Sequence, residues 1–247
     1  MEGLKNKTYI ITGASSGIGK NIAEYLTQEM QANVVLIARR YEIIKKMAEE
    51  LPGENYAFSF DFNQSDKVGS IFNYLKENNI LVDGMVYAAG IAPLFKLEEN
   101  EYDAMMQTMH VNALSFAEMG KYMLQGQCTV EHAAIVAVSS IVSLVTSNRQ
   151  SAYAASKTML NTYVKYLAKE ALGRMRVNAV LPGAVETELY DKLKSESFEF
   201  EEKIKRNYPL GVIPKEQVSK LVAFLLSQDA EYITGALYTI DSGYMLR

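Results

Sequence analysis

The amino-acid sequence predicts an α/β protein built on one doubly wound parallel sheet of about seven strands, with helices on both faces. Two observations support this prediction. Short apolar runs alternate with amphipathic stretches along the whole chain, and these runs are apolar throughout rather than at every second residue. A strand that is apolar on both sides is typical of a parallel sheet covered by helices on both faces.

The expected elements follow one another in strict alternation. Runs rich in β-branched and aromatic residues predict strands at 8–12 (TYIIT), 33–38 (NVVLIA), 56–60 (YAFSF), 83–89 (DGMVYAA), 133–139 (AAIVAVS), 175–181 (MRVNAVL) and 236–240 (ALYTI). Helical spacing of apolar residues predicts helices at 17–30, 42–51, 67–79, 101–124, 152–172 and about 215–227. Gly173 is suited to end the helix over 152–172. Because no repeat or Pro/Gly-rich linker divides the chain, we expect a single domain over 1–247.

The composition excludes several classes of protein. Apolar residues make up 49% of the 247 residues and charged residues 22%, which excludes a largely disordered chain. The net charge is −4 and no dense Lys/Arg block occurs, so no nucleic-acid partner is expected. A single cysteine, Cys128, cannot form an internal disulfide, and with only two histidines we expect no metal site.

No segment of the sequence indicates export or a membrane. The start, MEGLKNKTYIITGA, lacks the long apolar run of a signal peptide. The longest apolar stretch, AAIVAVSSIVSLV, is too short for a membrane span and carries three serines. We therefore expect a cytoplasmic protein.

The first predicted strand leads into a glycine-rich turn, TGASSGIG at 12–19. Glycine lets the backbone turn sharply and approach a phosphate, and the free N–H groups of the following helix attract an anion. The spacing differs from the usual G-x-G-x-x-G, so a turn without a ligand is the alternative. Its position as the first βα turn favours a dinucleotide, with the expected contacts Gly13, Ser15, Ser16, Gly17, Ile18 and Gly19.

The second predicted strand ends in two arginines, Arg39 and Arg40. An acidic residue near this point would bind the ribose hydroxyl of NAD, whereas an arginine suits the additional phosphate of NADP. Two solvated arginines at a helix start are the alternative. The sequence therefore favours NADP(H) as the cofactor.

Several motifs occur together in order along the chain. The glycine loop is followed by AAG at 88–90, VN at 111–112, Ser140, Y-x-A-S-K at 153–157 and PGAVET at 182–187. This set resembles the short-chain dehydrogenase/reductase family over essentially the whole chain. The resemblance implies a Rossmann fold and an NADP-dependent oxidoreductase that transfers a hydride between nicotinamide and a carbonyl or secondary alcohol, in the style of 3-oxoacyl-[acyl-carrier-protein] reductases.

A tyrosine can exchange a proton with a substrate only if its pKa falls from about 10 toward neutrality. Lys157 stands one helical turn after Tyr153, and its charge, with that of an oxidised nicotinamide, would favour the phenolate. Ser140 ends a strand at the sheet edge where ligands bind. The family resemblance implies that Ser140, Tyr153 and Lys157 are catalytic and that Asn112 joins them in a proton relay. A helix-surface Tyr/Lys pair is the alternative.

The resemblance also implies further cofactor contacts. Asp61 and Phe62 match the adenine contacts, Ala89 and Gly90 line a turn near the ribose, and Val185 with Thr187 hold the carboxamide. Tyr153 and Lys157 also contact the cofactor, and Pro182 and Gly183 form the turn before the carboxamide contacts. Ser139 should face away from Ser140 on the strand, and we interpret it as structural.

Two features of the sequence concern the substrate site. The family places a substrate lid at about 188–213, and Leu94, Phe95, Val142, Leu144 and Tyr190 suggest an apolar pocket wall. Tyr87 replaces the asparagine usual before AAG, which puts sheet packing in doubt rather than hydride transfer. We expect neither His110 nor His132 to be catalytic.

Two other functions remain open. One is a sugar or polyol dehydrogenase of the same family, and the other is a non-catalytic NADP-binding regulatory protein. The presence of both Tyr153 and Lys157 speaks against the second. The helices at 101–124 and 152–172 carry more apolar residues than one core-facing stripe needs, so we expect a homodimer or homotetramer.

Overall fold

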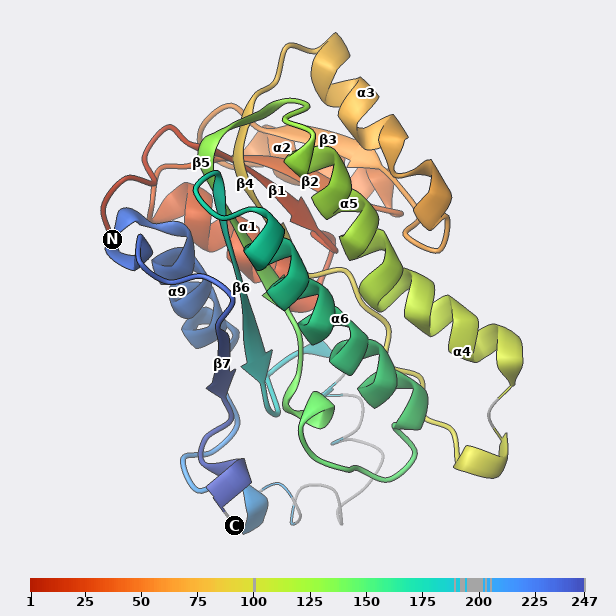
Figure 1. The fold of residues 1–247 in the computed structure, drawn as a ribbon. Coiled ribbons are helices and arrows are strands. Elements are labelled where there is room, and N and C mark those ends of the chain that lie inside the picture. The colour runs from red at the N-terminus through yellow and green to blue at the C-terminus, as the bar shows by residue number, and fades with distance from the viewer. Residues whose placement is uncertain are drawn as a thin grey trace.

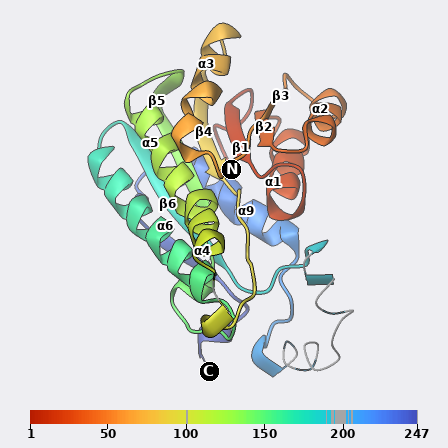
Figure 2. The ribbon, with the colours of Figure 1, turned by 90° about the vertical axis from the view of Figure 1, so that its right-hand side faces the viewer.

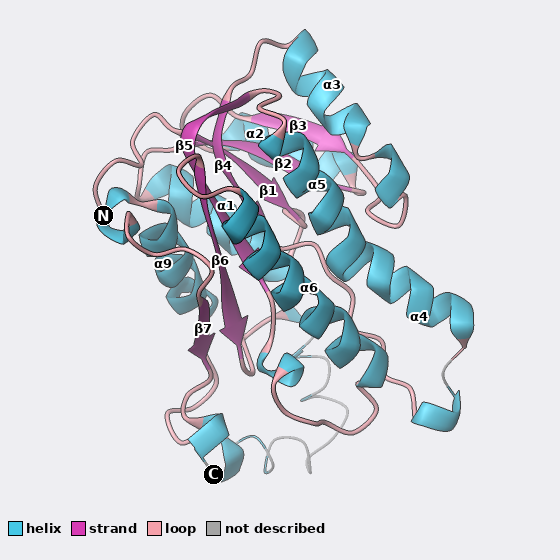
Figure 3. Ribbon diagram, in the orientation of Figure 1, coloured by secondary structure: helices cyan, strands magenta, loops and turns pink. Residues whose placement is uncertain are grey.

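A seven-stranded parallel sheet forms the centre of the molecule (Figures 1 and 3). The computed structural model describes residues 1–99, 101–188, 190, 191, 194, 202, 204 and 206–246. The strand order is β3-β2-β1-β4-β5-β6-β7. The bounds are β1 Thr8–Thr12, β2 Asn33–Ala38, β3 Tyr56–Ser59, β4 Val82–Tyr87, β5 Thr129–Val138, β6 Met175–Pro182 and β7 Leu237–Ile240. The predicted fold class is confirmed, and β5 begins four residues earlier than the sequence predicts.

Helices cover both faces of this sheet (Figure 2). One face packs against α1 (Gly17–Gln28), α2 (Tyr41–Glu50) and α9 (Lys215–Leu226). The other packs against α3 (Gly69–Glu77), α5 (Ser115–Leu124) and α6 (Ser151–Glu170), and α4 (Tyr102–Met109) packs against α6. Successive side chains of a strand point to opposite faces, so Ile10 joins the second layer while Tyr9 and Ile11 join the first. This explains why the strands are apolar at every position.

The predicted single helix over 101–124 is interrupted. A π-helical turn, His110–Leu114, separates α4 from α5. The N–H of Ser115 donates to the carbonyl of His110, five residues earlier, instead of four as in an α-helix. Such turns have no clear signature in a helical pattern and are frequent at functional sites. The turn holds Val111 and Asn112, both of which are buried.

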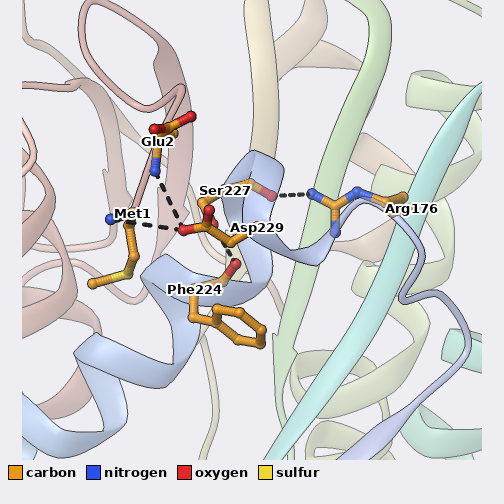
Figure 4. A network of polar contacts seen from close by, with 6 residues as sticks. All are labelled: Met1, Glu2, Arg176, Phe224, Ser227 and Asp229. Atoms are coloured by element: carbon orange, nitrogen blue, oxygen red, sulfur yellow. Dashed lines mark hydrogen bonds and ion pairs between the residues drawn. The ribbon is translucent and has the colours of Figure 1, made fainter.

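The start of the chain is tied to the end of α9 (Figure 4). The terminal amine of Met1 lies 3.7 Å from Asp229, whose carboxylate also accepts a hydrogen bond from the backbone N–H of Glu2. From β6, Arg176 donates to the carbonyls of Leu225 and Ser227 at 2.8 and 2.9 Å. A cation bound to the last carbonyls of a helix stabilises it through its dipole. Arg176 therefore fixes the end of α9 against the sheet.

Helix α1, which follows the glycine-rich turn, packs against α9. The hydroxyl of Ser219 on α9 donates to the side-chain carbonyl of Asn21 on α1 at 2.8 Å. Val218 and Val222 pack in the same buried cluster as Ile22 and Leu26.

No helix within the described part of the chain is long and apolar enough to cross a membrane.

Candidate active site

A cleft of about 760 Å³ opens at the carboxyl ends of the strands. Ligands of open α/β sheets bind at this edge, where the strand order reverses between β1 and β4. All the predicted site residues except Asn112 line this cleft. They are Gly13, Ser15, Ser16, Gly17, Ile18, Gly19, Arg39, Arg40, Asp61, Phe62, Ala89, Gly90, Ser140, Tyr153, Lys157, Pro182, Gly183, Val185 and Thr187. The volume is suitable for a cofactor together with a small substrate.

The glycine loop fits tightly against the ends of β1 and β4. A Cβ atom at Gly13 would lie 2.8 Å from the carbonyl oxygen of Ala88, and one at Gly19 would lie 2.6 Å from the carbonyl oxygen of Gly13. Gly13 also has a φ of +66°. The Thr12 hydroxyl accepts hydrogen bonds from the N–H groups of Ala88 and Ala89, both at 3.0 Å. The loop and the AAG turn are therefore one rigid unit.

Arg40 braces the same loop. Its guanidinium donates to the hydroxyl oxygens of Ser15 and Ser16 at 2.9 and 2.8 Å. Since these hydroxyls accept from Arg40, their own protons can be donated to an anion above the loop. Among the described residues, no side chain caps the N-terminus of α1, and its first turn contains no acidic residue. The unsatisfied N–H groups and the arginines fit the phosphates of a dinucleotide.

Tyr153, Lys157 and Ser140 come together at the middle of the cleft. Tyr153 and Lys157 lie one turn apart on α6, and the Lys157 amine is 5.7 Å from the centre of the Tyr153 ring. Lys157 is 4% exposed and donates to the Val138 carbonyl at 2.8 Å. Ser140 follows β5, and its side chain lies close enough to Tyr153 to lower the pKa of the phenol through hydrogen bonding. A serine and a lysine thus approach the phenol from two different elements.

Burial dominates the electrostatics of this group. It lowers the pKa of Lys157 to about 8, because the charged ammonium is removed from water. Burial also raises the pKa of Tyr153, and the hydrogen bond with Ser140 partly opposes this rise. The phenol is therefore protonated at neutral pH in this structure. The expectation that Lys157, with an oxidised nicotinamide, lowers this pKa is therefore wrong for the lysine alone, because burial of the phenol outweighs any effect of the nearby ammonium.

Asn112 lies below the cleft rather than in its wall. Its side chain is fully buried and binds both backbone groups of Ile91: the carbonyl of Asn112 accepts from the Ile91 N–H at 2.8 Å, and its amide donates to the Ile91 carbonyl at 2.9 Å. The amide also donates to the Ser156 hydroxyl at 2.8 Å, which donates to the Tyr153 carbonyl at 2.7 Å. Asn112 therefore links the turn after β4 to the helix of Tyr153.

Other predicted residues lie as follows. Ser139 is buried and its N–H donates to the Val180 carbonyl of the neighbouring strand at 2.8 Å, as a structural residue does. Asp61 accepts a hydrogen bond from the N–H of Asn63, and the Thr187 hydroxyl accepts one from the N–H of Tyr190. His110 lies in the π-helical turn, 2.8 Å from the Ser65 hydroxyl.

The predicted apolar wall is only partly correct. Val142 and Tyr190 line the cleft, but Leu94, Phe95 and Leu144 are not among its lining residues. Leu144 is 49% exposed and directly follows a short 3₁₀ turn, Ile141–Ser143. Much of the predicted lid at 188–213 lies outside the described residues.

Sequence reasoning missed several residues that line the cleft. Three of them are amides, Gln107, Gln150 and Asn207, and two form an aromatic pair, Tyr208 and Tyr244. The centres of these two rings are 4.9 Å apart, although the residues stand in different segments of the chain. No local sequence signal indicates such a pairing. Thr12, by contrast, ends a strand directly before the glycine loop, a position from which its bonding role was predictable.

Among the described residues, no group of three or more His, Cys, Asp or Glu side chains is placed to hold a metal ion.

Known proteins show the same combination of fold and motifs. A family model described as Enoyl-(Acyl carrier protein) reductase matches residues 13–245. A human 3-oxoacyl-[acyl-carrier-protein] reductase is 34% identical over 243 residues, which cover 98% of this chain and 99% of that protein. The chain belongs to the short-chain dehydrogenase/reductase family.

Other members of this family are similar over comparable lengths. A 3-oxoacyl-[acyl-carrier-protein] reductase of Thermotoga maritima is 31% identical, with 98% of this chain and 99% of that protein covered. Among solved structures, a short-chain type dehydrogenase/reductase from Mycobacterium ulcerans has a TM-score of 0.89 at 25% identity, covering 99% of this chain and 92% of that chain. A 4-hydroxyisoleucine dehydrogenase complexed with NADH has a TM-score of 0.90 at 25% identity, covering 98% and 100%.

Membership of the short-chain dehydrogenase/reductase family establishes the general chemistry. The protein is an oxidoreductase that acts on a CH–OH group or a carbonyl, with a nicotinamide cofactor. The glycine cradle and the uncapped start of α1 fit the phosphates of that cofactor, as described above.

Proposed function

We propose that the protein is an NADP(H)-dependent reductase of the short-chain dehydrogenase/reductase family whose substrate is a 3-oxoacyl compound or a related ketone. The observation that carries this proposal is the meeting of Ser140, Tyr153 and Lys157 in one cleft with the glycine loop. When bound, the nicotinamide cofactor supplies or accepts the hydride. The remaining steps are proton transfer and positioning by the chain's own residues.

Tyr153 is the proposed general acid in the reductive direction. Its phenol proton goes to the substrate oxygen as the carbonyl carbon is reduced, and in the oxidative direction the phenolate takes that proton back. Ser140 donates a hydrogen bond to the same oxygen and so holds it beside Tyr153. The positive charge of Lys157 stabilises the phenolate that remains after proton transfer.

Asn112 has a supporting place in this proposal. Its side-chain atoms are engaged with Ile91 and Ser156, so its amide orients the cleft wall and the Tyr153 helix. A proton relay that passes near Asn112 remains a prediction of the family resemblance.

The preference for NADP(H) rests on Arg39 and Arg40. Both line the cleft after β2, where the cofactor's adenosine ribose would lie. Arg40 is already held by Ser15 and Ser16, which places its charge beside the phosphate loop at no further entropic cost. Arg39 stands next to it and can bind the additional phosphate of NADP.

A sugar or polyol dehydrogenase is the second candidate. The amides of Gln107, Gln150 and Asn207 line the same cleft and could bind substrate hydroxyl groups. A 3-oxoacyl substrate would instead use the apolar surface of Val142, Val145 and Ile204. The cleft has both polar and apolar lining, so an activity assay is needed to distinguish the 3-oxoacyl reductase from the sugar or polyol dehydrogenase.

The test is a screen of the purified protein with NADPH and NADH against three groups of substrates: 3-oxoacyl thioesters, ketosugars and simple ketones. The proposal predicts turnover of a 3-oxoacyl thioester with NADPH preferred over NADH by at least about tenfold in kcat/KM, corresponding to one good phosphate contact. Faster turnover of ketosugars would favour the second candidate. Equal use of NADH and NADPH would contradict the role proposed for Arg39 and Arg40.

Three broader expectations belong to the same proposal. One domain spans 1–247, with a substrate lid at about 188–213. The protein works in the cytoplasm. Copies associate as a homodimer or homotetramer through the outer helices, because Tyr102 on α4 and Tyr166 on α6 are 69% and 63% exposed.

A further inference from the structure

The hydroxyl of Tyr87 reaches into the interrupted helix. Tyr87 ends β4 and is fully buried, with its ring edge-to-face against Phe62 and Phe116 at centroid distances of 5.6 and 5.5 Å. Its backbone stays in register with Thr12 of β1 and Ala137 of β5. The tyrosine therefore leaves sheet packing intact, and its hydroxyl donates to the Val111 carbonyl at 2.6 Å.

The π-helical turn takes one α-helical donor away from the Val111 carbonyl. In a continuous α-helix, the N–H of Ser115 would donate to Val111. Here it donates to His110 instead. Val111 is only 9% exposed, and a buried carbonyl without a donor costs about 1–3 kcal/mol. The Tyr87 hydroxyl thus compensates for the change of helical register at this point.

Two side chains at the turn, those of Ser115 and His110, also contact the segment that follows β3. The Ser115 hydroxyl donates to the Phe62 carbonyl at 2.6 Å, and His110 lies 2.8 Å from the Ser65 hydroxyl. All these contacts fix the one turn that presents Asn112 to Ile91 on one side and to Ser156 on the other. The position of Asn112 therefore depends on how firmly the turn is anchored to β4.

We propose that Tyr87 is a positioning residue for the reaction. Its hydroxyl fixes the π-helical turn, and this turn holds Asn112 between the Gly90–Ile91 backbone and the helix of Tyr153. The inference rests on the proposed function for its effect on turnover. Its structural half, the anchoring of Asn112 and Ile91, stands on the contacts alone.

The test is Tyr87→Phe, which keeps the ring and removes only the hydroxyl. We expect kcat to fall about tenfold with the KM for substrate and cofactor unchanged, because displaced catalytic groups lower the rate while the cleft walls remain. Hydrogen exchange of the Ile91 N–H, which donates to Asn112, should become faster.

The matched control is Tyr9→Phe. Tyr9 is also a buried tyrosine, 2% exposed, but it lies on β1 in the layer on the other face of the sheet and does not line the cleft. Removing its hydroxyl should leave kcat and the Ile91 exchange rate within twofold of wild type. If Tyr87→Phe does not fold, Ser115→Ala replaces it, since it removes another anchor of the same turn and should show the same split between kcat and KM.

A wild-type kcat in Tyr87→Phe, or an equal loss in Tyr9→Phe, would overturn the inference; a loss confined to Tyr87→Phe supports it. Failure of the proposed function looks different, because the wild-type protein would then reduce no carbonyl substrate. In that case the Ile91 exchange rate still decides whether Tyr87 anchors the turn: unchanged exchange overturns the inference, and faster exchange in Tyr87→Phe alone supports it.

Discussion

Lys157 brings a positive charge to a place where water hardly reaches it. The only hydrogen bond described for its amine goes to the Val138 carbonyl, and the side chain is 4% exposed. Burial makes this charge costly for stability, but it also strengthens the interaction of the ammonium with Tyr153. The buried ammonium of Lys157 therefore lowers the stability of the fold and at the same time places a positive charge beside the phenol of Tyr153.

Lys157 gives a pH-dependent prediction. Its pKa is about 8 in the folded protein, below the ordinary value of 10.5, so the unfolded chain binds more protons between these two values. The free energy of unfolding of the wild type should therefore rise relative to Lys157→Met as the pH increases from 8 to about 10.5, by at most about 3 kcal/mol. Urea denaturation of both proteins at pH 7 and pH 10 measures this. If the free energy of unfolding of the wild type differs from that of Lys157→Met by the same amount at pH 7 and pH 10, the prediction is wrong.

At the scale of elements, the glycine loop and the ends of β1 and β4 form one close-packed junction. Gly13 has no room for a Cβ atom because the Ala88 backbone lies against it. The same residue needs a positive φ, which a larger residue adopts only with strain. Two independent constraints thus act on one position, and the loop cannot relax without moving β4.

Gly13→Ala should separate these two constraints when it is compared with Gly126→Ala. Gly126 has a similar φ of +71°, but a Cβ there would meet no described atom within 4 Å. Gly126→Ala should cost about 1 kcal/mol from backbone strain alone. Gly13→Ala should cost at least about 2 kcal/mol and abolish the rise in melting temperature produced by NADPH. Thermal melts with and without NADPH measure both effects, and equal behaviour of the two variants would show that the contact with Ala88 is unimportant.

Most elements of this fold were predictable from the sequence because their signals are local. The strands β1 and β2 are continuous apolar runs, and the loop between β1 and α1 has its own glycine pattern. The π-helical turn was not predictable, because it arises from contacts of Tyr87, Phe62 and Ser65 with residues far along the chain. The same holds for the Tyr208–Tyr244 pair and for the burial of Asn112. Motif spacing indicated the candidate site residues, and the tertiary structure shows which of them line the cleft.

At the scale of the whole molecule, the outer helices present apolar side chains that the core does not use. Tyr102, Tyr166 and Leu172 are each more than 60% exposed, and they lie on or directly after helices of the same face. A subunit interface would cover exposed apolar side chains on these outer helices. Sedimentation at micromolar concentration should therefore give the mass of a dimer or tetramer of the 27.6 kDa chain. A monomer alone under these conditions would contradict the proposed association.

In the proposed function, Tyr153 transfers a proton in the reduction of a carbonyl. Tyr153→Phe keeps the ring and the position of Lys157 but removes the transferable proton, so kcat with NADPH and a 3-oxoacyl thioester should fall at least about a hundredfold. Tyr166→Phe, on the same helix but 63% exposed, is the matched control and should keep wild-type turnover. The Kd of NADPH, measured by fluorescence titration, should change less than about threefold in either variant. A Tyr153→Phe protein that binds NADPH and still turns over substrate within twofold of the wild-type rate would show that Tyr153 is not the proton donor.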